Sequence, residues 1–232
     1  MMAGPSLLLS MGQRTVTFSF EIILKNLPYL INAAKWTLLI SLAGMAISIF
    51  LGIFVCAGRI SRQAFVRNFA AVYVSFFRGV PLLVQLLIFY YMLPYVGLDL
   101  PAIGAAILAV GMCSAAYTAE ILRGALQAIP RGQIEAADAL GIAPIWVWVR
   151  ILIPEALRIG MPSLVNELIL LVKVSSLASV VGVVELTRVA QNITGVTYRP
   201  LEIYIAAAMI YLVINSIISL LGRFAEQRFN TG

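Results

Sequence analysis

The chain has 232 residues, of which 62% are hydrophobic and 11% are charged, and its mean hydropathy is +0.99. This composition excludes a soluble globular domain and predicts an all-α integral membrane protein. The net charge of +6 needs no nucleic-acid partner, because membrane proteins carry an excess of Lys and Arg on their cytoplasmic side.

An N-terminal segment, residues 1–26, precedes the first long apolar stretch. Charges interrupt its apolar residues, so we expect an interfacial lead-in helix. A cleavable signal peptide is disfavoured, because the apolar run Leu7–Leu9 is short and lacks a charged preface. The rest of the chain is expected to form one transmembrane domain, residues 27–228, and a short tail, residues 229–232. The charges of the lead-in are Arg14, Glu21 and Lys25.

Five later stretches are long and apolar enough to cross a bilayer, because a hydrocarbon core of about 30 Å requires about 20 helical residues. The second is the weakest, since the segment Arg78–Pro81 places a charge and a Gly/Pro break inside it. Such a break is stable at membrane depth only where it faces protein or water, so we expect a bent or broken helix. The five stretches are Leu30–Ala57, Val66–Leu93, Pro101–Leu122, Leu157–Val181 and Ile203–Leu221.

Basic residues collect on one side of these spans. They flank the connection between the first two spans, surround the polar insert between the third and fourth, and recur in the tail. The preference of Lys and Arg for cytoplasmic loops therefore predicts an external N-terminus and a cytoplasmic C-terminus. The residues are Arg59, Arg62, Arg67, Arg123, Arg131, Arg150, Arg158, Arg223 and Arg228.

The polar insert, residues 131–154, predicts a compact helix-turn-helix knob. Its alanines favour a short first helix that presents little bulk to a partner, and Gly141 ends that helix. Pro144 suits the first turn of a second helix, over Ile145–Leu152, which Pro154 ends. The first helix contains Glu135, Ala136, Ala137 and Asp138.

The spacing inside this insert resembles the cytoplasmic loop by which the membrane subunits of bacterial ABC importers bind their ATPase. The signature is Glu-Ala-Ala, three residues, Gly, nine residues, then Ile-x-Leu-Pro, and Ile153 replaces the Leu here. Glu-Ala-Ala alone would also fit an amphipathic surface helix between two spans, whereas the full spacing favours the coupling loop. The resemblance implies a type-1 ABC transporter transmembrane domain whose ATPase-coupling residues are Glu135, Ala136, Ala137, Asp138, Gly141 and Pro154.

Residues for catalysis or energy conversion are missing from the sequence. There is no histidine, and Cys56 and Cys113 fall in different apolar spans, which disfavours a metal site or a disulfide framework. No glycine-rich phosphate loop occurs, so we expect a non-enzymatic chain without cofactors, with ATP and Mg²⁺ bound by a partner ATPase.

Polar residues inside the spans are costly in lipid and are therefore candidates for a translocation pathway. The ammonium of Lys173 suits the α-carboxylate of an amino acid, although snorkelling to the outer interface would also explain it. Ser114 and Tyr117 share one face of the third span, where hydrogen bonds between helices would explain them equally well. Glu120 and Arg123, three residues apart, predict a local ion pair. The pathway candidates are Lys173, Ser175, Ser114, Tyr117 and Arg78.

Further segments resemble the polar amino acid permease branch of the ABC importers, and this similarity runs from Leu27 to Arg228. It implies a dimer of permease subunits, identical or related, in the lipid bilayer of the bacterial inner membrane. It also implies a cytoplasmic ATPase dimer and a periplasmic or lipid-anchored binding protein that delivers the amino acid. The segments are Phe77–Gln85, Ser114–Gly124, Gly132–Ala137 and Leu171–Ser179.

One departure from this branch bears on the substrate. Members often carry Lys-Asp-Thr-Ser-Leu where this chain reads Lys-Val-Ser-Ser-Leu, so Val174 replaces an acid. Without that acid a cationic side chain loses a partner, and we expect a neutral polar or an acidic amino acid as the cargo. A basic amino acid or an opine is the alternative.

Two functions from other classes fit the same spans. A passive channel would need no ATP, but the rings of acids and carbonyl loops common in ion channels do not stand out here. A scaffold subunit would use its polar residues only as contacts between helices. A permease differs from both because its ATPase responds to a loaded binding protein.

Overall fold

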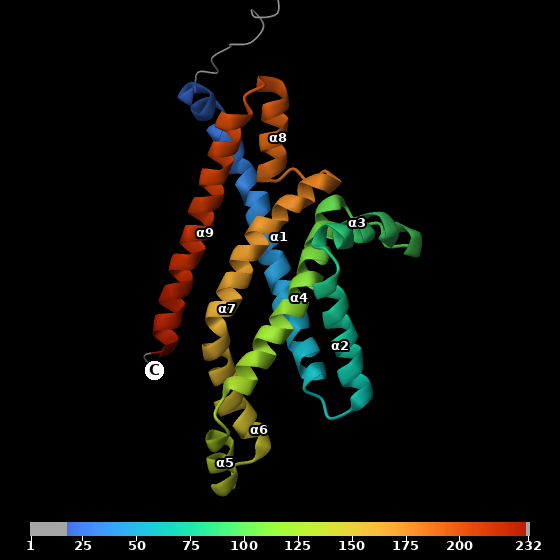
Figure 1. Ribbon diagram of the computed structural model, residues 1–232, viewed down its shortest axis with the longest axis vertical. Helices are drawn as coiled ribbons and strands as arrows, with labels where there is room; N and C mark the ends of the chain where they lie inside the picture. Colours follow the sequence, from blue (N-terminus) through green and yellow to red (C-terminus); the bar gives the residue numbers. More distant parts are fainter. Residues whose placement is uncertain (1–17, 231–232) are drawn as a thin grey trace, which may run out of the picture.

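The computed structural model describes residues 18–230, with side chains described up to Gln227, and every regular element in that range is a helix. The long helices run along the length of the molecule, and α3 lies across their direction (Figure 1). The long helices are α1 (Phe20–Arg59), α4 (Ala102–Ala128), α7 (Ile153–Val174) and α9 (Pro200–Asn230). The shorter ones are α2 (Ala64–Gly79), α3 (Leu82–Met92), α5 (Arg131–Ala139), α6 (Pro144–Val147) and α8 (Leu186–Thr197).

The all-α membrane architecture with about five spans is confirmed. Four helical stretches within the described residues are long and apolar enough to cross a membrane, and the pair α2 and α3 forms a fifth candidate. The start of α1 and the end of α9 point toward opposite ends of the molecule, as five crossings require (Figure 1). Helix α1 already begins at Phe20, so the last part of the expected lead-in continues into the first span, and residues 1–17 lie outside the described residues.

The break in the second span is confirmed as a bend of 105° between α2 and α3. Val80 is extended, as a residue before proline prefers, and Pro81 has no N–H to continue the helix. The side-chain amide of the buried Gln85 donates hydrogen bonds to the carbonyls of Phe77 at 2.9 Å and Val80 at 2.7 Å. This amide takes the place of backbone donors that the bend removes, which keeps broken backbone stable away from water.

Helices α1 and α4 approach closely because small residues line their contact. Gly44, Ser48 and Gly52 recur every four residues on the buried face of α1. A Cβ atom placed on Gly52 would lie 2.7 Å from the Cγ2 atom of Thr118, and one placed on Gly111 would lie 2.8 Å from Ile47. The contact therefore excludes side chains at these glycines, as in other closely packed membrane helices.

At the end opposite the knob, the fully buried Glu185 fixes α8 between α1 and α9. Its carboxylate accepts hydrogen bonds from the backbone N–H groups of Thr187 at 2.9 Å and Arg188 at 2.8 Å, and from the Tyr211 hydroxyl at 3.0 Å. Burial raises the pKa of the Glu185 carboxyl, while these hydrogen bonds oppose that shift by stabilising the charged form. A carboxylate at a helix N-terminus is favourable, so Glu185 positions the start of α8.

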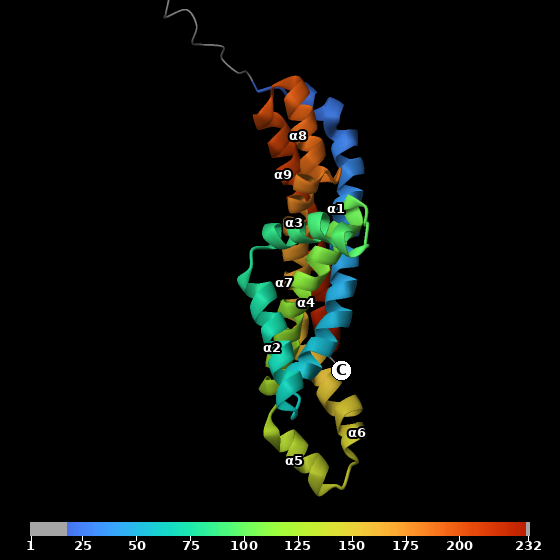
Figure 2. The ribbon, with the colours of Figure 1, turned by 90° about the vertical axis from the view of Figure 1, so that its right-hand side faces the viewer.

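The polar insert forms a helical knob that protrudes at one end of the molecule (Figure 2). Gly141 ends α5 as predicted, but the prediction that Pro154 ends the second helix is wrong. Helix α6 continues through a π-turn, Trp148–Leu152, directly into α7. The N–H of Ile153 bonds to the carbonyl of Trp148, five residues back. This wider turn leaves room for the Pro154 ring, which would clash with a carbonyl in a regular α-helix.

Candidate coupling knob and membrane pocket

The knob separates the predicted coupling residues into a surface set and a buried residue. Ala137 is buried in a small cluster with Val147 and Leu152, so it holds the two arms of the knob together, and its coupling role stays a prediction. The other five predicted residues are exposed: Glu135, Ala136, Asp138, Gly141 and Pro154.

Apolar side chains that the sequence interpretation missed cover the tip of the knob. Leu140, Ile145 and Trp146 are exposed on the knob, which protrudes at one end of the molecule (Figure 1). Exposed apolar residues grouped in this way are typical of a protein contact. In the sequence, these residues could have been recognised as apolar side chains inside a polar insert.

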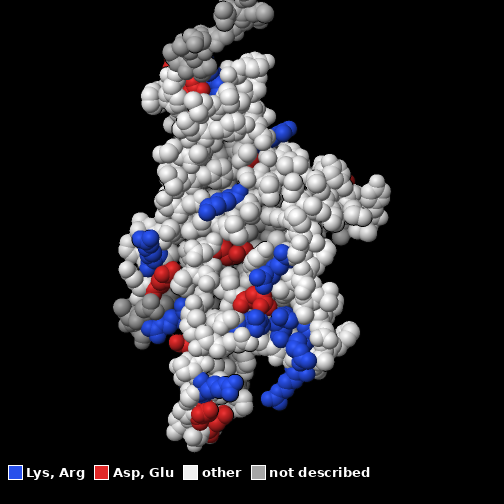
Figure 3. Space-filling view, viewed as in Figure 1, with Lys and Arg blue, Asp and Glu red and all other residues white. Residues whose placement is uncertain are grey.

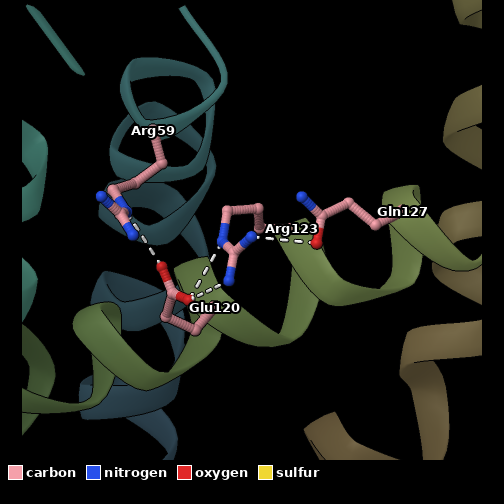
Figure 4. Close-up of polar contacts among 4 residues, drawn as sticks. All are labelled: Arg59, Glu120, Arg123 and Gln127. Atoms are coloured by element: carbon pink, nitrogen blue, oxygen red, sulfur yellow. Dashed lines mark hydrogen bonds and ion pairs between the residues drawn. The ribbon is translucent and has the colours of Figure 1, made fainter.

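An ion-pair cluster joins α1 to α4 just before the knob (Figure 4). Glu120 accepts hydrogen bonds from Arg123 at 3.0 and 2.6 Å and from Arg59 at 3.1 Å. Arg123 also donates to the side chain of Gln127 at 2.9 Å. The predicted pair of Glu120 and Arg123 is confirmed, whereas its link to Arg59 depends on a contact across 61 residues of sequence. The cluster fixes the end of α1 against the helix that leads into α5.

A cavity of about 330 Å³ lies where the bend between α2 and α3 faces α4 and α7. Three predicted pathway residues line it, namely Arg78, Ser114 and Tyr117. The guanidinium carbon of Arg78 lies 5.3 Å from the centroid of the Tyr117 ring, which is a cation–π contact. The bend thus places the exposed Arg78 cation at the wall of an open pocket between the helices.

The other two predicted pathway residues do not line this pocket. Lys173 is exposed, although its neighbour Val174 belongs to the pocket wall. Ser175 is buried and its hydroxyl donates to the carbonyl of Val172 at 2.8 Å. Their roles in a pathway stay predictions.

A buried hydrogen-bond chain connects α1, α4 and α7 and ends at Glu167. The Ser114 hydroxyl donates to the Glu167 carboxylate at 2.6 Å, and the Ser48 hydroxyl donates to Ser114 at 2.9 Å. Ser48 and Thr118 are 2.7 Å apart, and because the Ser48 proton is already used, Thr118 is the donor of that bond. The sequence predicts two roles for the polar face of α4: hydrogen bonds to other helices, or the lining of a cavity. Ser114 does both.

Glu167 is a pocket residue that the sequence interpretation missed. It is 7% exposed and lines the pocket beside Leu170, Leu171 and Val174. Its signal was available, because an acid inside a predicted span is a functional candidate for the same reason as Lys173.

Residues 44–231 match the family of binding-protein-dependent transport system inner membrane components. The chain belongs to this family. Its members are permease subunits of ABC transporters and are not enzymes, because a separate subunit hydrolyses ATP. The coarse prediction of a multi-pass membrane permease is thus confirmed.

Relatives of the permease cover almost its whole length. A probable amino-acid ABC transporter permease of Bacillus subtilis, YckA, is 38% identical over 213 residues, which are 91% of this chain and 94% of YckA. The glutamine transport permease GlnP of Escherichia coli is 37% identical, and the match covers 91% of this chain and 97% of GlnP. The nopaline transport permease NocM of Agrobacterium fabrum is 36% identical, and the match covers 90% of this chain and 91% of NocM.

Solved structures share the fold of this permease. The crystal structure of an amino acid ABC transporter with histidines contains a chain that is 37% identical, with a TM-score of 0.85, covering 92% of this chain and 100% of that one. A chain of the MetNI methionine transporter in an inward-facing conformation has a TM-score of 0.72 at 22% identity and supports the fold alone.

Proposed function

We propose that this permease carries polar amino acids across the bacterial inner membrane in an ATP-driven importer. Relatives named for amino-acid, glutamine and nopaline transport support this substrate class. We further propose that two permease subunits, identical or related, bind a cytoplasmic ATPase dimer that holds ATP and Mg²⁺. A periplasmic or lipid-anchored binding protein would deliver the amino acid from the other side.

The observation that carries the proposal is that the same two helices reach both the knob and the pocket. Helix α4 leads into α5, and α6 runs through the π-turn into α7 without a break. Ser114 and Tyr117, near the middle of α4, and Glu167 of α7 line the pocket. A displacement of the knob is therefore transmitted to both walls of the pocket.

This connection supports a two-state cycle. ATP binding closes the ATPase subunits and draws the knobs together, α4 and α7 rock, and the pocket opens to the outside. Hydrolysis restores the inward-facing state. The substrate must bind the two states with different strength, because only a differential interaction shifts such an equilibrium. We propose Arg78, Ser114 and Tyr117 as pocket contacts, Lys173 as a contact on the exposed surface beside the pocket, and Ser175 as a support for the end of α7.

The proposed orientation places the knob and the C-terminus in the cytoplasm and the start of α1 outside. Basic side chains gather toward the knob end of the face in Figure 3, as the preference of Lys and Arg for cytoplasmic loops predicts. An ATPase dimer would then have access to Glu135, Ala136, Asp138, Gly141 and Pro154.

Purification of the tagged permease from its own membranes tests this proposal. We expect an ATPase to co-purify and its turnover to rise when a binding protein loaded with amino acid is added. A chain that conducts alone in a bilayer would instead support the passive channel. Partners whose turnover ignores both substrate and binding protein would support the scaffold.

Val174 is expected to set the charge preference of the pocket, because it lines the wall where related permeases often carry an acid. The substitution Val174→Asp should raise the affinity for arginine relative to glutamine about tenfold or more, since a desolvated carboxylate favours a cation. The matched control Val174→Asn has nearly the same size without the charge. The measurement is binding of labelled amino acids to the permease–ATPase complex without binding protein. Equal arginine preference in both variants would contradict this role.

A further inference from the structure

We propose that Glu167 and Arg78 recognise the charged head group that all free α-amino acids share. Glu167 binds the α-ammonium group and Arg78 binds the α-carboxylate. This inference rests on the proposed function and assigns the chemistry of its pocket. It adds Glu167 to the pathway residues named above, as the side chain that supplies the negative charge of the site.

The first support is that Glu167 is a buried carboxylate without a cation. It is 7% exposed, and none of the ion pairs among the described side chains, residues 18–227, includes it. A carboxylate inside a membrane protein is costly unless it is paired, and an unpaired one marks a functional site. The pocket that Glu167 lines is the space in which a cation of the substrate can reach it.

The second support is the direction of the hydrogen-bond chain. The hydroxyl protons of Thr118, Ser48 and Ser114 all point along the chain toward the carboxylate of Glu167. Donors aligned in this way reinforce each other and stabilise negative charge at the last acceptor. The hydrogen-bond chain ends on one carboxylate oxygen of Glu167. Several described side-chain atoms are buried and have no hydrogen-bond partner, and the other carboxylate oxygen of Glu167 does not belong to that group. The second oxygen can therefore serve a ligand.

The third support is the position of Arg78 relative to Glu167. Arg78 lies over Tyr117, and Glu167 bonds to Ser114. Ser114 and Tyr117 are one turn apart on α4, so their side chains begin about 5–6 Å from each other. The two charges thus face neighbouring positions of one helix without forming an ion pair within 4.0 Å. This arrangement leaves room for a ligand with a positive and a negative group one carbon apart.

The rest of the pocket wall indicates a neutral side chain. Val110, Leu170, Leu171 and Val174 line it. Among the described residues, Arg78 and Glu167 are the only charged ones of the wall, and the head group uses both of them. A volume of about 330 Å³ is at the small end of ligand pockets. The site therefore fits a free amino acid with an uncharged side chain and disfavours a charged one.

A binding experiment with matched analogues tests the assignment. The complex of permease and ATPase is placed in nanodiscs without binding protein, and labelled L-glutamine is displaced by unlabelled competitors. One competitor, glutaramate, lacks the α-amino group, and another, 4-aminobutanamide, lacks the α-carboxylate. L-leucine, 4-methylpentanoate and 3-methylbutylamine form a second set with an apolar side chain, in which labelled L-leucine is the displaced ligand.

In the wild type, removal of either head group should weaken competition about tenfold or more, because a site built for a polar group rejects an analogue that lacks it. In Glu167→Gln, the penalty for losing the amino group should vanish while the penalty for losing the carboxylate remains. In Arg78→Gln, the pattern should reverse. Glu155→Gln is the matched control, since Glu155 is an acid of the same helix about 18 Å away along its axis and outside the pocket wall.

The analogue sets separate recognition from a structural effect. If Glu167→Gln weakened the amino acid and both analogues by the same factor, Glu167 would only shape the pocket and the assignment would be overturned. If the wild type binds amino acids but the variants retain both penalties, the head-group assignment fails while amino acid transport stands. A wild-type complex that binds no amino acid of a wider panel would remove the proposed function, and this assignment with it.

Discussion

The substitution Gly141→Val is expected to uncouple ATP hydrolysis from amino acid uptake while the protein stays in the membrane. Gly141 has a φ of +67°, and its N–H bonds to the carbonyl of Asp138 while the N–H of Ile142 bonds to that of Ala137. These two bonds end α5 in the Schellman arrangement, which favours glycine at this position. A β-branched residue there costs about 1–3 kcal/mol, so the turn that orients both arms of the knob should change.

The measurement is uptake per ATP hydrolysed in reconstituted complexes, and we expect a loss of about tenfold or more, as for a misplaced functional element. Gly141→Asn is the matched control, because asparagine tolerates the left-handed conformation better than other residues. No atom lies within 4 Å of a Cβ placed at Gly141, so the asparagine side chain has space within this chain. Normal coupling in the valine variant would contradict the assignment of the knob.

The substitution Gly52→Val should strongly destabilise the fold. A Cβ atom at Gly52 would lie 2.7 and 2.9 Å from side-chain atoms of Thr118 and 3.3 Å from the carbonyl oxygen of Ala115. Overpacking of this kind costs about 1–3 kcal/mol or more. It should also force α1 away from α4 and break the nearby bond between Ser48 and Thr118.

Heating in detergent followed by size-exclusion chromatography measures this effect. We expect the Gly52→Val variant to lose its monodisperse fraction at a clearly lower temperature than the wild type. Gly124→Val is the control, because Gly124 lies in α4 and nothing lies within 4 Å of its added Cβ. Equal losses in the two variants would show that helix propensity, and not the close contact of α1 and α4, sets the stability.

The sequence predicted the features that local chemistry determines. The bend at Pro81 follows from a missing N–H and a restricted preceding residue, and the pair of Glu120 and Arg123 follows from helical spacing. The end of α5 at Gly141 follows from the freedom of glycine at positive φ. Each of these depends on residues within one or two helical turns.

Features that depend on contacts between distant segments could not be predicted. Arg59 joins Glu120 across 61 residues, and Gln85 supports the bend only because the helix turns back over it. The face of α7 that meets the pocket includes Glu167, Leu171 and Val174, which follow the spacing of one helical face, and Lys173 falls off that face. Only the packing of α7 against α4 selects this face.

The continuity of α6 and α7 shows where a local rule fails. A proline inside a helical pattern normally ends the helix, and this rule predicted a stop at Pro154. The π-turn just before it provides the room that the ring needs. This turn makes α6, the second arm of the knob, continuous with α7, which the proposed transmission of force from the ATPase requires.

Uptake of a panel of labelled polar amino acids, glutamine among them, by proteoliposomes that contain the permease, its ATPase and its binding protein tests the central claim most directly. We predict accumulation above the external concentration when Mg–ATP is available to the ATPase, and none with a non-hydrolysable ATP analogue or without the loaded binding protein. Equilibration of a panel of amino acids without ATP would contradict the account and support a passive channel. Absence of any amino acid uptake, in complexes whose ATPase still responds to the binding protein, would contradict the proposed substrate class.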